Sequence, residues 1–177
     1  HGSWAYPEFG YLKIGAVPLF SGFMYAAVGS YMARVTRIFD FTYSHYPRPA
    51  YTYGLALAIY INFFAHHYVW DARLILFAVT ALIFARTWVH YRVFRKRHRM
   101  PLLVGFGLVA LFIWIAENIG TWSKVWLYPN QLKGWALVTS GKFGSWYLLM
   151  IISFVLVNMV HQPKPFSAAS SSLPKGG

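Results

Sequence analysis

Five long apolar runs, separated by short polar or basic segments, constrain this sequence more than any other feature. They cover residues 17–36, 52–68, 72–89, 101–119 and 143–160. A helix of about 20 apolar residues crosses the roughly 30 Å hydrocarbon core of a bilayer, and each run approaches that length. The chain is 58% apolar and only 11% charged, so it has few polar side chains with which to cover a soluble globule. We therefore predict an all-α, polytopic membrane protein with about five transmembrane helices, formed by one domain over 1–162 and followed by a disordered tail over 163–177.

The basic residues indicate how such a protein would sit in a bacterial inner membrane. A net charge of +12 suits nucleic-acid binding in a soluble protein. Here, however, most lysines and arginines flank apolar runs, as they do on the cytoplasmic side of membrane proteins. We therefore predict the lipid bilayer as a partner and no nucleic acid. Arg34, Arg37 and Asp40 are spaced for an ion pair at the inner end of the first run.

The basic segment 90–100 fixes the expected orientation. If it is cytoplasmic, alternation of the spans places 34–51 and the C-terminus inside as well. The N-terminal segment and residues 68–72 and 120–142 are then outside, so that most basic residues fall inside.

A short aromatic motif occurs twice on the predicted outer side. Trp126-Leu127-Tyr128-Pro129 repeats Trp4-Ala5-Tyr6-Pro7, and each copy precedes an inward-running span, which predicts a parallel pseudo-repeat. Tryptophans at this level form an aromatic belt and often serve only as interfacial anchors. The repeated spacing with Tyr and Pro makes several motif residues candidates for ligand contact: Trp4, Tyr6, Trp126, Tyr128 and Pro129.

Glu117 is the acid expected to lie deepest, near the outer end of the fourth run. A carboxylate within the bilayer costs on the order of 3 kcal/mol, so it must be protonated, paired or facing a polar cavity. Trp114, on the same helical face, would shield it from water, and Asn118 would orient it. The alternative is a structural glutamate paired with Lys124 or Arg73.

Further polar and small residues lie at helical spacing. Asn62 and His66 share one face of the second run and could line an outer-leaflet pocket together with Glu117. His66 could serve as an axial ligand for a haem or a chlorophyll. The other histidines divide between the two sides, so no metal site is predicted. Three small residues in the first run, Gly22, Ala26 and Ser30, predict a helix-packing stripe.

Several segments together resemble a known family. HGSWAYPE at the start, VPLFSGFMYAAVGSYMAR from Val17, IYINFFAHHYVWDAR from Ile59, FIWIAENIGTW from Phe112 and YPNQLKGW from Tyr128 are similar to the bacterial domain-of-unknown-function 817 family of integral membrane proteins. The resemblance implies further helices ahead of His1. These helices, or other membrane subunits, would be partners of the present chain.

A weaker likeness is to the small membrane lycopene cyclases and carotenoid hydratases, which pair intramembrane acids with Trp-x-Tyr turns. Their Pro-Leu-Glu-Glu signature is absent, because Phe20 and Ser21 follow Pro18-Leu19. This departure argues against acid-catalysed isoprenoid chemistry.

Two functions of different kinds remain. The first is a non-enzymatic binding or accessory subunit of a membrane complex, with an outer-leaflet pocket for a lipid, isoprenoid, carotenoid or chlorophyll-type ligand. The alternative is an isoprenoid- or lipid-modifying enzyme. In that enzyme Glu117 would be the general acid, with Trp126 and Tyr128 stabilising a carbocation. A transporter is disfavoured because no run is broken at its centre by Gly or Pro.

Overall fold

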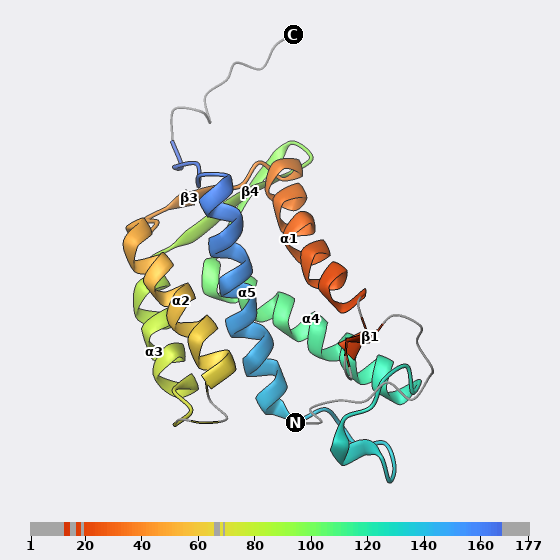
Figure 1. Ribbon diagram of the computed structural model, residues 1–177. Coiled ribbons are helices and arrows are strands. Elements are labelled where there is room, and N and C mark those ends of the chain that lie inside the picture. The colour runs from red at the N-terminus through yellow and green to blue at the C-terminus, as the bar shows by residue number, and fades with distance from the viewer. Residues whose placement is uncertain (1–12, 15–16, 19, 66–67, 69, 168–177) are drawn as a thin grey trace.

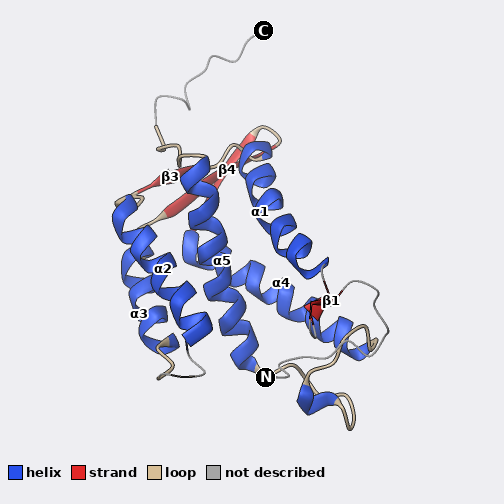
Figure 2. Ribbon diagram, in the orientation of Figure 1, coloured by secondary structure: helices blue, strands red, loops and turns tan. Residues whose placement is uncertain are grey.

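The computed structural model describes residues 13–14, 17–18, 20–65, 68 and 70–167. Within these residues the fold is mostly helical, with two small antiparallel sheets (Figures 1 and 2). The helices are α1 (Phe20–Ile38), α2 (Pro49–Ala65), α3 (Arg73–Phe84), α4 (Leu102–Trp122), the single 3-10 turn η1 (Pro129–Gln131) and α5 (Ser140–Val160). The strands are β1 (Lys13–Ile14), β2 (Val17–Pro18), β3 (Thr42–Ser44), β4 (Trp88–Val93) and β5 (Lys96–Pro101).

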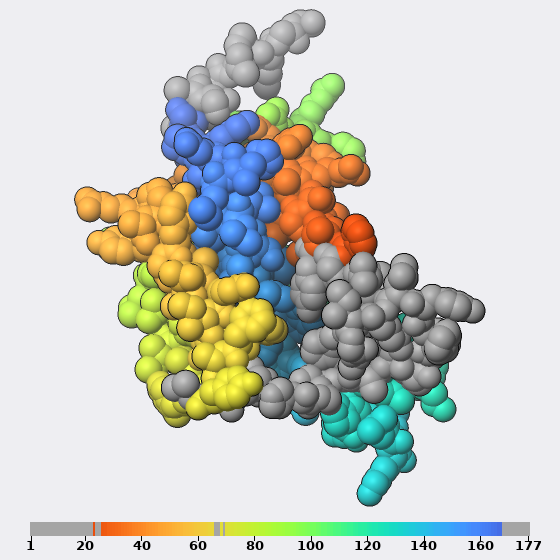
Figure 3. All heavy atoms as spheres, viewed as in Figure 1, coloured from red at the N-terminus to blue at the C-terminus, as the bar shows by residue number. Residues whose placement is uncertain are grey.

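Helix α5 is the centre of the bundle and packs against α1, α2 and α4. In Figure 3 it reaches the surface between α2 and α1. Its buried residue Phe154 packs in an aromatic cluster with Phe106 of α4 and Phe84 of α3, whose rings meet edge to face. The ring centroids of Phe106 and Phe154 are 5.1 Å apart, and that of Phe84 lies 6.0 Å from Phe106. Such edge-to-face pairs contribute about 0.5–1.5 kcal/mol each beyond the apolar area that they bury.

The predicted all-α class is wrong at one end of the bundle. There β3, β4 and β5 form a three-stranded antiparallel sheet, and the basic segment 90–100, expected to be a loop, lies in the β4–β5 hairpin. Apolar and basic residues of the hairpin fall on opposite faces. Val89 is 1% exposed and pairs with Met100, whereas Arg92 pairs with Arg97 on the opposite face. One face therefore packs on the core and the other is cationic.

Five transmembrane helices stay a prediction, because fewer of the described helices have the length and apolar composition of a span. Among the described residues, α4 and α5 are long and apolar enough to cross a membrane, with mean hydropathies of 2.1 and 1.9. Helix α3, which corresponds to the most uniformly apolar run, ends at Phe84 and is about 18 Å long at 1.5 Å per residue, too short to span the hydrocarbon core. The chain turns at Ala85 and Arg86 and enters β4 instead.

The outward faces of the helices are rich in large apolar side chains. Leu57, Phe64, Leu82, Phe112 and Leu156 are all exposed. A surface of this kind suits contact with hydrocarbon more than contact with water.

The polar segments sort to two ends of the molecule. Residues Lys164 and Phe166, within the predicted tail, bond the backbone of Tyr43 in β3 at 2.9 Å each and so join the sheet end. The α2–α3 connection and the segment after α4 lie at the opposite end (Figure 1). The number of times the chain crosses the membrane and the side that each end faces stay predictions.

The ion pairs of the sheet end differ from the predicted arrangement. Asp40 accepts from Arg92 at 2.7 Å and lies 3.9 Å from Arg97, while Arg37 contacts His161 instead. The hairpin supplies these partners, and spacing along a single helix could not reveal them. The Arg92 guanidinium lowers the pKa of Asp40 below its usual value.

Candidate functional site

Glu117 lies in the last turns of α4 with its side chain buried, at 6% exposure. The Tyr128 hydroxyl donates a hydrogen bond to its Oε1 at 2.5 Å. Its Oε2 is buried and has no hydrogen-bond partner among the described residues. A buried polar atom without a partner costs about 1–3 kcal/mol, and more when the group is charged. The carboxylate is thus fixed on one side, and the described residues leave its other oxygen unsatisfied.

Lys142, at the start of α5, brings a positive charge to this centre. Its Nζ lies 4.6 Å from the centroid of the Tyr128 ring, in a cation–π contact, and its charge attracts Glu117. The sequence suggested Lys124 or Arg73 as the partner of Glu117. In the structure Lys124 is exposed and Arg73 pairs with Asp71. Lys142 was missed because its proximity to Tyr128 depends on the fold of the intervening loop.

The segment after α4 folds back because a glutamine organises it. Gln131 is almost fully buried. Its Oε1 accepts from the Tyr128 backbone N–H at 3.1 Å, and its Nε2 donates to the Ala136 carbonyl at 2.6 Å and to Thr121 at 3.3 Å. Pro129 begins η1, where its missing N–H is tolerated. Sequence reasoning missed Gln131, which holds the Trp-x-Tyr-Pro turn against α4.

The tryptophans near Glu117 pack between α4 and the segment that follows it. A Cβ on Gly120 would lie 2.4 Å from Cη2 of Trp126, so the indole rests directly on the α4 backbone. Trp114 donates its indole N–H to the Val138 carbonyl at 3.1 Å. Asn118 accepts from the Val138 N–H and donates to the Trp114 carbonyl. The group that bonds Glu117 is therefore Tyr128, while Asn118 secures the loop.

A second polar cluster lies at the α2–α3 connection. The Asn62 carbonyl oxygen accepts from the Ala72 N–H at 2.9 Å, and its amide donates to Asp71. The Arg73 guanidinium bonds Asp71 at 2.6 Å and, with backbone and Asn62 bonds, lowers the pKa of Asp71 to about 2. Arg73 also reaches Ser145 of α5 at 3.4 Å, and its charge repels Lys142. The cluster thus adjoins the Glu117 centre.

Other predicted site residues cannot be placed in this arrangement. Trp4, Tyr6 and His66 lie outside the described residues, as does the side-chain environment of Gly22. Ala26 and Ser30 are exposed, so helix packing along that stripe stays a prediction. Within the described part of the chain, no group of three or more histidines and acids could hold a metal ion.

Together these features define a mostly helical protein in which a buried carboxylate lies where two helices of membrane-spanning length approach each other. The chain belongs to the family described as protein of unknown function (DUF817), whose model matches residues 1–154, and the resemblance noted in its sequence is thereby confirmed.

The chain is also similar to the uncharacterized protein YoaT of Bacillus subtilis (strain 168). The two are 46% identical over 172 residues, which cover 97% of this chain and 65% of that protein, so the chain spans about two thirds of the length of this relative. No solved structure matches the chain.

Proposed function

We propose that this protein is a non-enzymatic, multi-pass membrane protein that binds an apolar ligand at the Glu117 centre, as an accessory subunit of a larger complex. The ligand would be a lipid, an isoprenoid or a pigment that carries a hydroxyl or amine. The observation that supports this proposal is the buried Oε2 of Glu117, an acceptor for which the described residues provide no donor.

The energetics favour a ligand that donates a hydrogen bond. A hydroxyl placed against Oε2 would satisfy the carboxylate, and hydrogen bonds to charged groups contribute about 1.5–3 kcal/mol. The apolar part of the ligand would lie against α4 on the Glu117 side, where Ile113 is one helical turn before Glu117 on the same face and is partly buried. Binding sites of this kind combine a mainly apolar lining with a few polar groups that fix orientation.

The enzymatic alternative draws its support from the short Tyr128–Glu117 hydrogen bond, which holds the carboxyl in one orientation. A general acid must present its proton to the substrate within hydrogen-bond reach. Here Oε1 is occupied by Tyr128, and the Trp126 ring proposed to stabilise a cation is packed on Gly120. Helices α4 and α5 are also continuous, unlike the broken helices of many transporters. Binding therefore accounts for more of the geometry than catalysis or transport.

The experiment compares wild type with Glu117→Gln in the full-length protein, purified from its own host in a mild detergent. Extracted small molecules are measured by mass spectrometry. Wild type should retain a defined apolar compound in a fixed ratio to protein. Glu117→Gln keeps an acceptor for Tyr128 but presents an amide donor where Oε2 was, so it should lose the compound.

Asp40→Asn, at the far end of the molecule, is the matched control and should retain the compound. A monodisperse wild-type protein without ligand or partner would contradict the proposal, as would equal retention in Glu117→Gln. A changed cellular lipid or pigment profile in the Glu117→Gln strain would instead favour the enzyme.

A further inference from the structure

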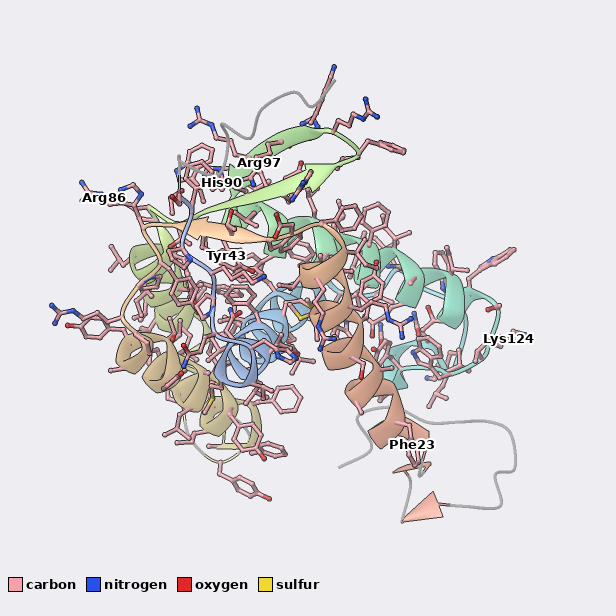
Figure 4. The ribbon with its side chains drawn as sticks, turned by 90° about the horizontal axis from the view of Figure 1, so that it is seen from above. Phe23, Tyr43, Arg86, His90, Arg97 and Lys124 are labelled. Carbon is pink, nitrogen blue, oxygen red and sulfur yellow. The ribbon has the colours of Figure 1, made fainter. Side chains whose placement is uncertain are left out.

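The sheet end carries a large excess of positive charge. Among the described residues at this end, Asp40 is the one acid and ten residues are basic: Arg34, Arg37, Arg48, Arg86, Arg92, Arg95, Lys96, Arg97, Arg99 and Lys164. Figure 4 looks down on this end and labels Arg86 at one edge of it and Arg97 at the β4–β5 hairpin. A surface of this composition attracts anions.

A cleft opens at this end between the last turn of α1 and the β4–β5 hairpin. Its volume is about 660 Å³, and both charged and apolar groups line it, among them Arg37, Ile38, Asp40, Arg92 and Phe94. Volumes of about 300–1,000 Å³ are typical of small-molecule sites. Two guanidinium groups and one carboxylate leave this lining with a net positive charge.

An apolar stripe on α1 leads to the cleft. Phe23, Tyr31 and Ile38 are 75%, 68% and 66% exposed. Their spacings of eight and seven residues place them on one face of the helix. Figure 4 labels Phe23 at the end of α1 farthest from the hairpin, and Ile38 lines the cleft at the other end. The stripe is thus spread along most of α1, with the exposed Arg34 between Tyr31 and Ile38 on the same face.

The tip of the hairpin adds a second apolar group beside cations. Phe94 is 96% exposed, has a positive φ of 52° and is followed by Arg95 and Lys96. Large apolar side chains flanked by basic residues are typical of segments that lie at the surface of anionic membranes.

We propose that this cleft binds one anionic phospholipid of the surrounding membrane. Its phosphate lies between Arg37 and Arg92, and an acyl chain follows the Phe23–Tyr31–Ile38 stripe. An acidic protein would match the charge alone, whereas a phospholipid matches both the charge and the apolar stripe. The inference rests on the membrane location in the proposed function and is independent of the ligand at Glu117.

The Asp40 carboxylate would compete with the lipid phosphate for Arg92. It bonds Arg92 at 2.7 Å and lies 3.9 Å from Arg97, so a phosphate approaching Arg92 meets the repulsion of this carboxylate. Removing the Asp40 charge should therefore strengthen lipid binding, although it breaks an ion pair. A purely structural pair would show no such gain.

The test measures binding of fluorescent phosphatidylglycerol and phosphatidylcholine to the full-length protein in neutral detergent. Wild type should prefer phosphatidylglycerol. One basic residue near an anionic lipid contributes about 1 kcal/mol, so Arg92→Gln should weaken phosphatidylglycerol binding about fivefold. Arg86→Gln, at the same end but away from the cleft, is the matched control and should change it by less than about twofold. Asp40→Asn should strengthen it.

Arg37→Gln provides a second test should Arg92→Gln fail to fold, and it should weaken binding to a similar extent. Equal binding of the two lipids would overturn the proposal. So would equal losses for Arg92→Gln and Arg86→Gln, weaker binding by Asp40→Asn, or full displacement of the lipid by millimolar inorganic phosphate. Any of these results, with the compound still retained by wild type and lost from Glu117→Gln, would leave the function proposed for the Glu117 centre intact.

Discussion

The two ends of this molecule place their acidic side chains in opposite environments. At the sheet end the Asp40 side chain is 34% exposed and lies beside Arg92 and Arg97 in a strongly basic surface. At the other end Glu117 is buried, with one oxygen bonded to Tyr128 and the other without a partner among the described residues. An exposed ion pair contributes little stability, about 0–1 kcal/mol, whereas a half-satisfied buried carboxylate is costly. The sheet end is thus suited to a charged surface, and the Glu117 end to a specific ligand.

The comparison predicts that the ends face opposite sides of the membrane, which should give an all-or-none difference in labelling. The chain has no cysteine, so Phe94→Cys and Lys124→Cys each provide a single reactive thiol at an exposed position. A membrane-impermeant maleimide should label Lys124→Cys in intact cells and Phe94→Cys only after permeabilisation. Equal labelling of both variants in intact cells would break the comparison.

Tyr128→Phe should produce the largest loss of stability among conservative changes. It removes the hydroxyl that donates to Glu117 and leaves both carboxylate oxygens without a described partner, at a cost of about 3 kcal/mol. Thermal or denaturant unfolding in detergent measures the change. Tyr31→Phe, on the exposed face of α1, should change stability by less than about 0.5 kcal/mol. Similar effects of both variants would show that the Glu117 bond is unimportant.

Gly120→Ala should cost about 1–3 kcal/mol, because the added methyl group forces the Trp126 ring and its loop away from α4. Gly105→Ala in the same helix is the control. Its nearest neighbour would be Met100 at an ordinary 3.6 Å, and alanine favours a helix by up to about 1 kcal/mol. The control should therefore be neutral or stabilising. A neutral Gly120→Ala would mean that the loop is not seated on α4.

The smallest predicted effect is the stability that the Asp71–Arg73 pair loses at low pH. Because the folded pKa of Asp71, about 2, lies below its ordinary value of 3.8, the pair stabilises the fold above about pH 4. This contribution is lost as the pH falls towards 2. With side chains about one-third exposed, it amounts to less than about 1 kcal/mol. Unfolding measured between pH 5 and pH 3 should show wild type losing more stability than Asp71→Asn, and parallel losses would argue against the pair.

Apolar length and charge predicted much of the framework. The runs 101–119 and 143–160 correspond closely to α4 and α5, because long apolar helices are recognisable without tertiary information. The β4–β5 hairpin was missed because its arginines resemble a solvated loop, although Val89, Tyr91 and Val93 alternate with polar residues. The length of α3 was overestimated because the apolar sequence of this helix continues into the buried face of β4.

The Glu117 centre was predicted only in part. Its acid and the Trp-x-Tyr-Pro turn were identified, since acids near an apolar run are rare and conspicuous. The bond from Tyr128 to Glu117, 11 residues away, and the contact with Lys142 require the chain to reverse direction around Gln131. Helical periodicity contains no information about such a reversal, so the pairing could come only from the fold.

The most direct test of the binding centre is an experimental map of the full-length protein in a lipid nanodisc. The account predicts non-protein density within hydrogen-bond distance of Glu117 Oε2, extending along α4 on the Glu117 side, and its loss in Glu117→Gln. A map in which Lys142 pairs directly with Oε2, with no additional density beside it, would contradict the account.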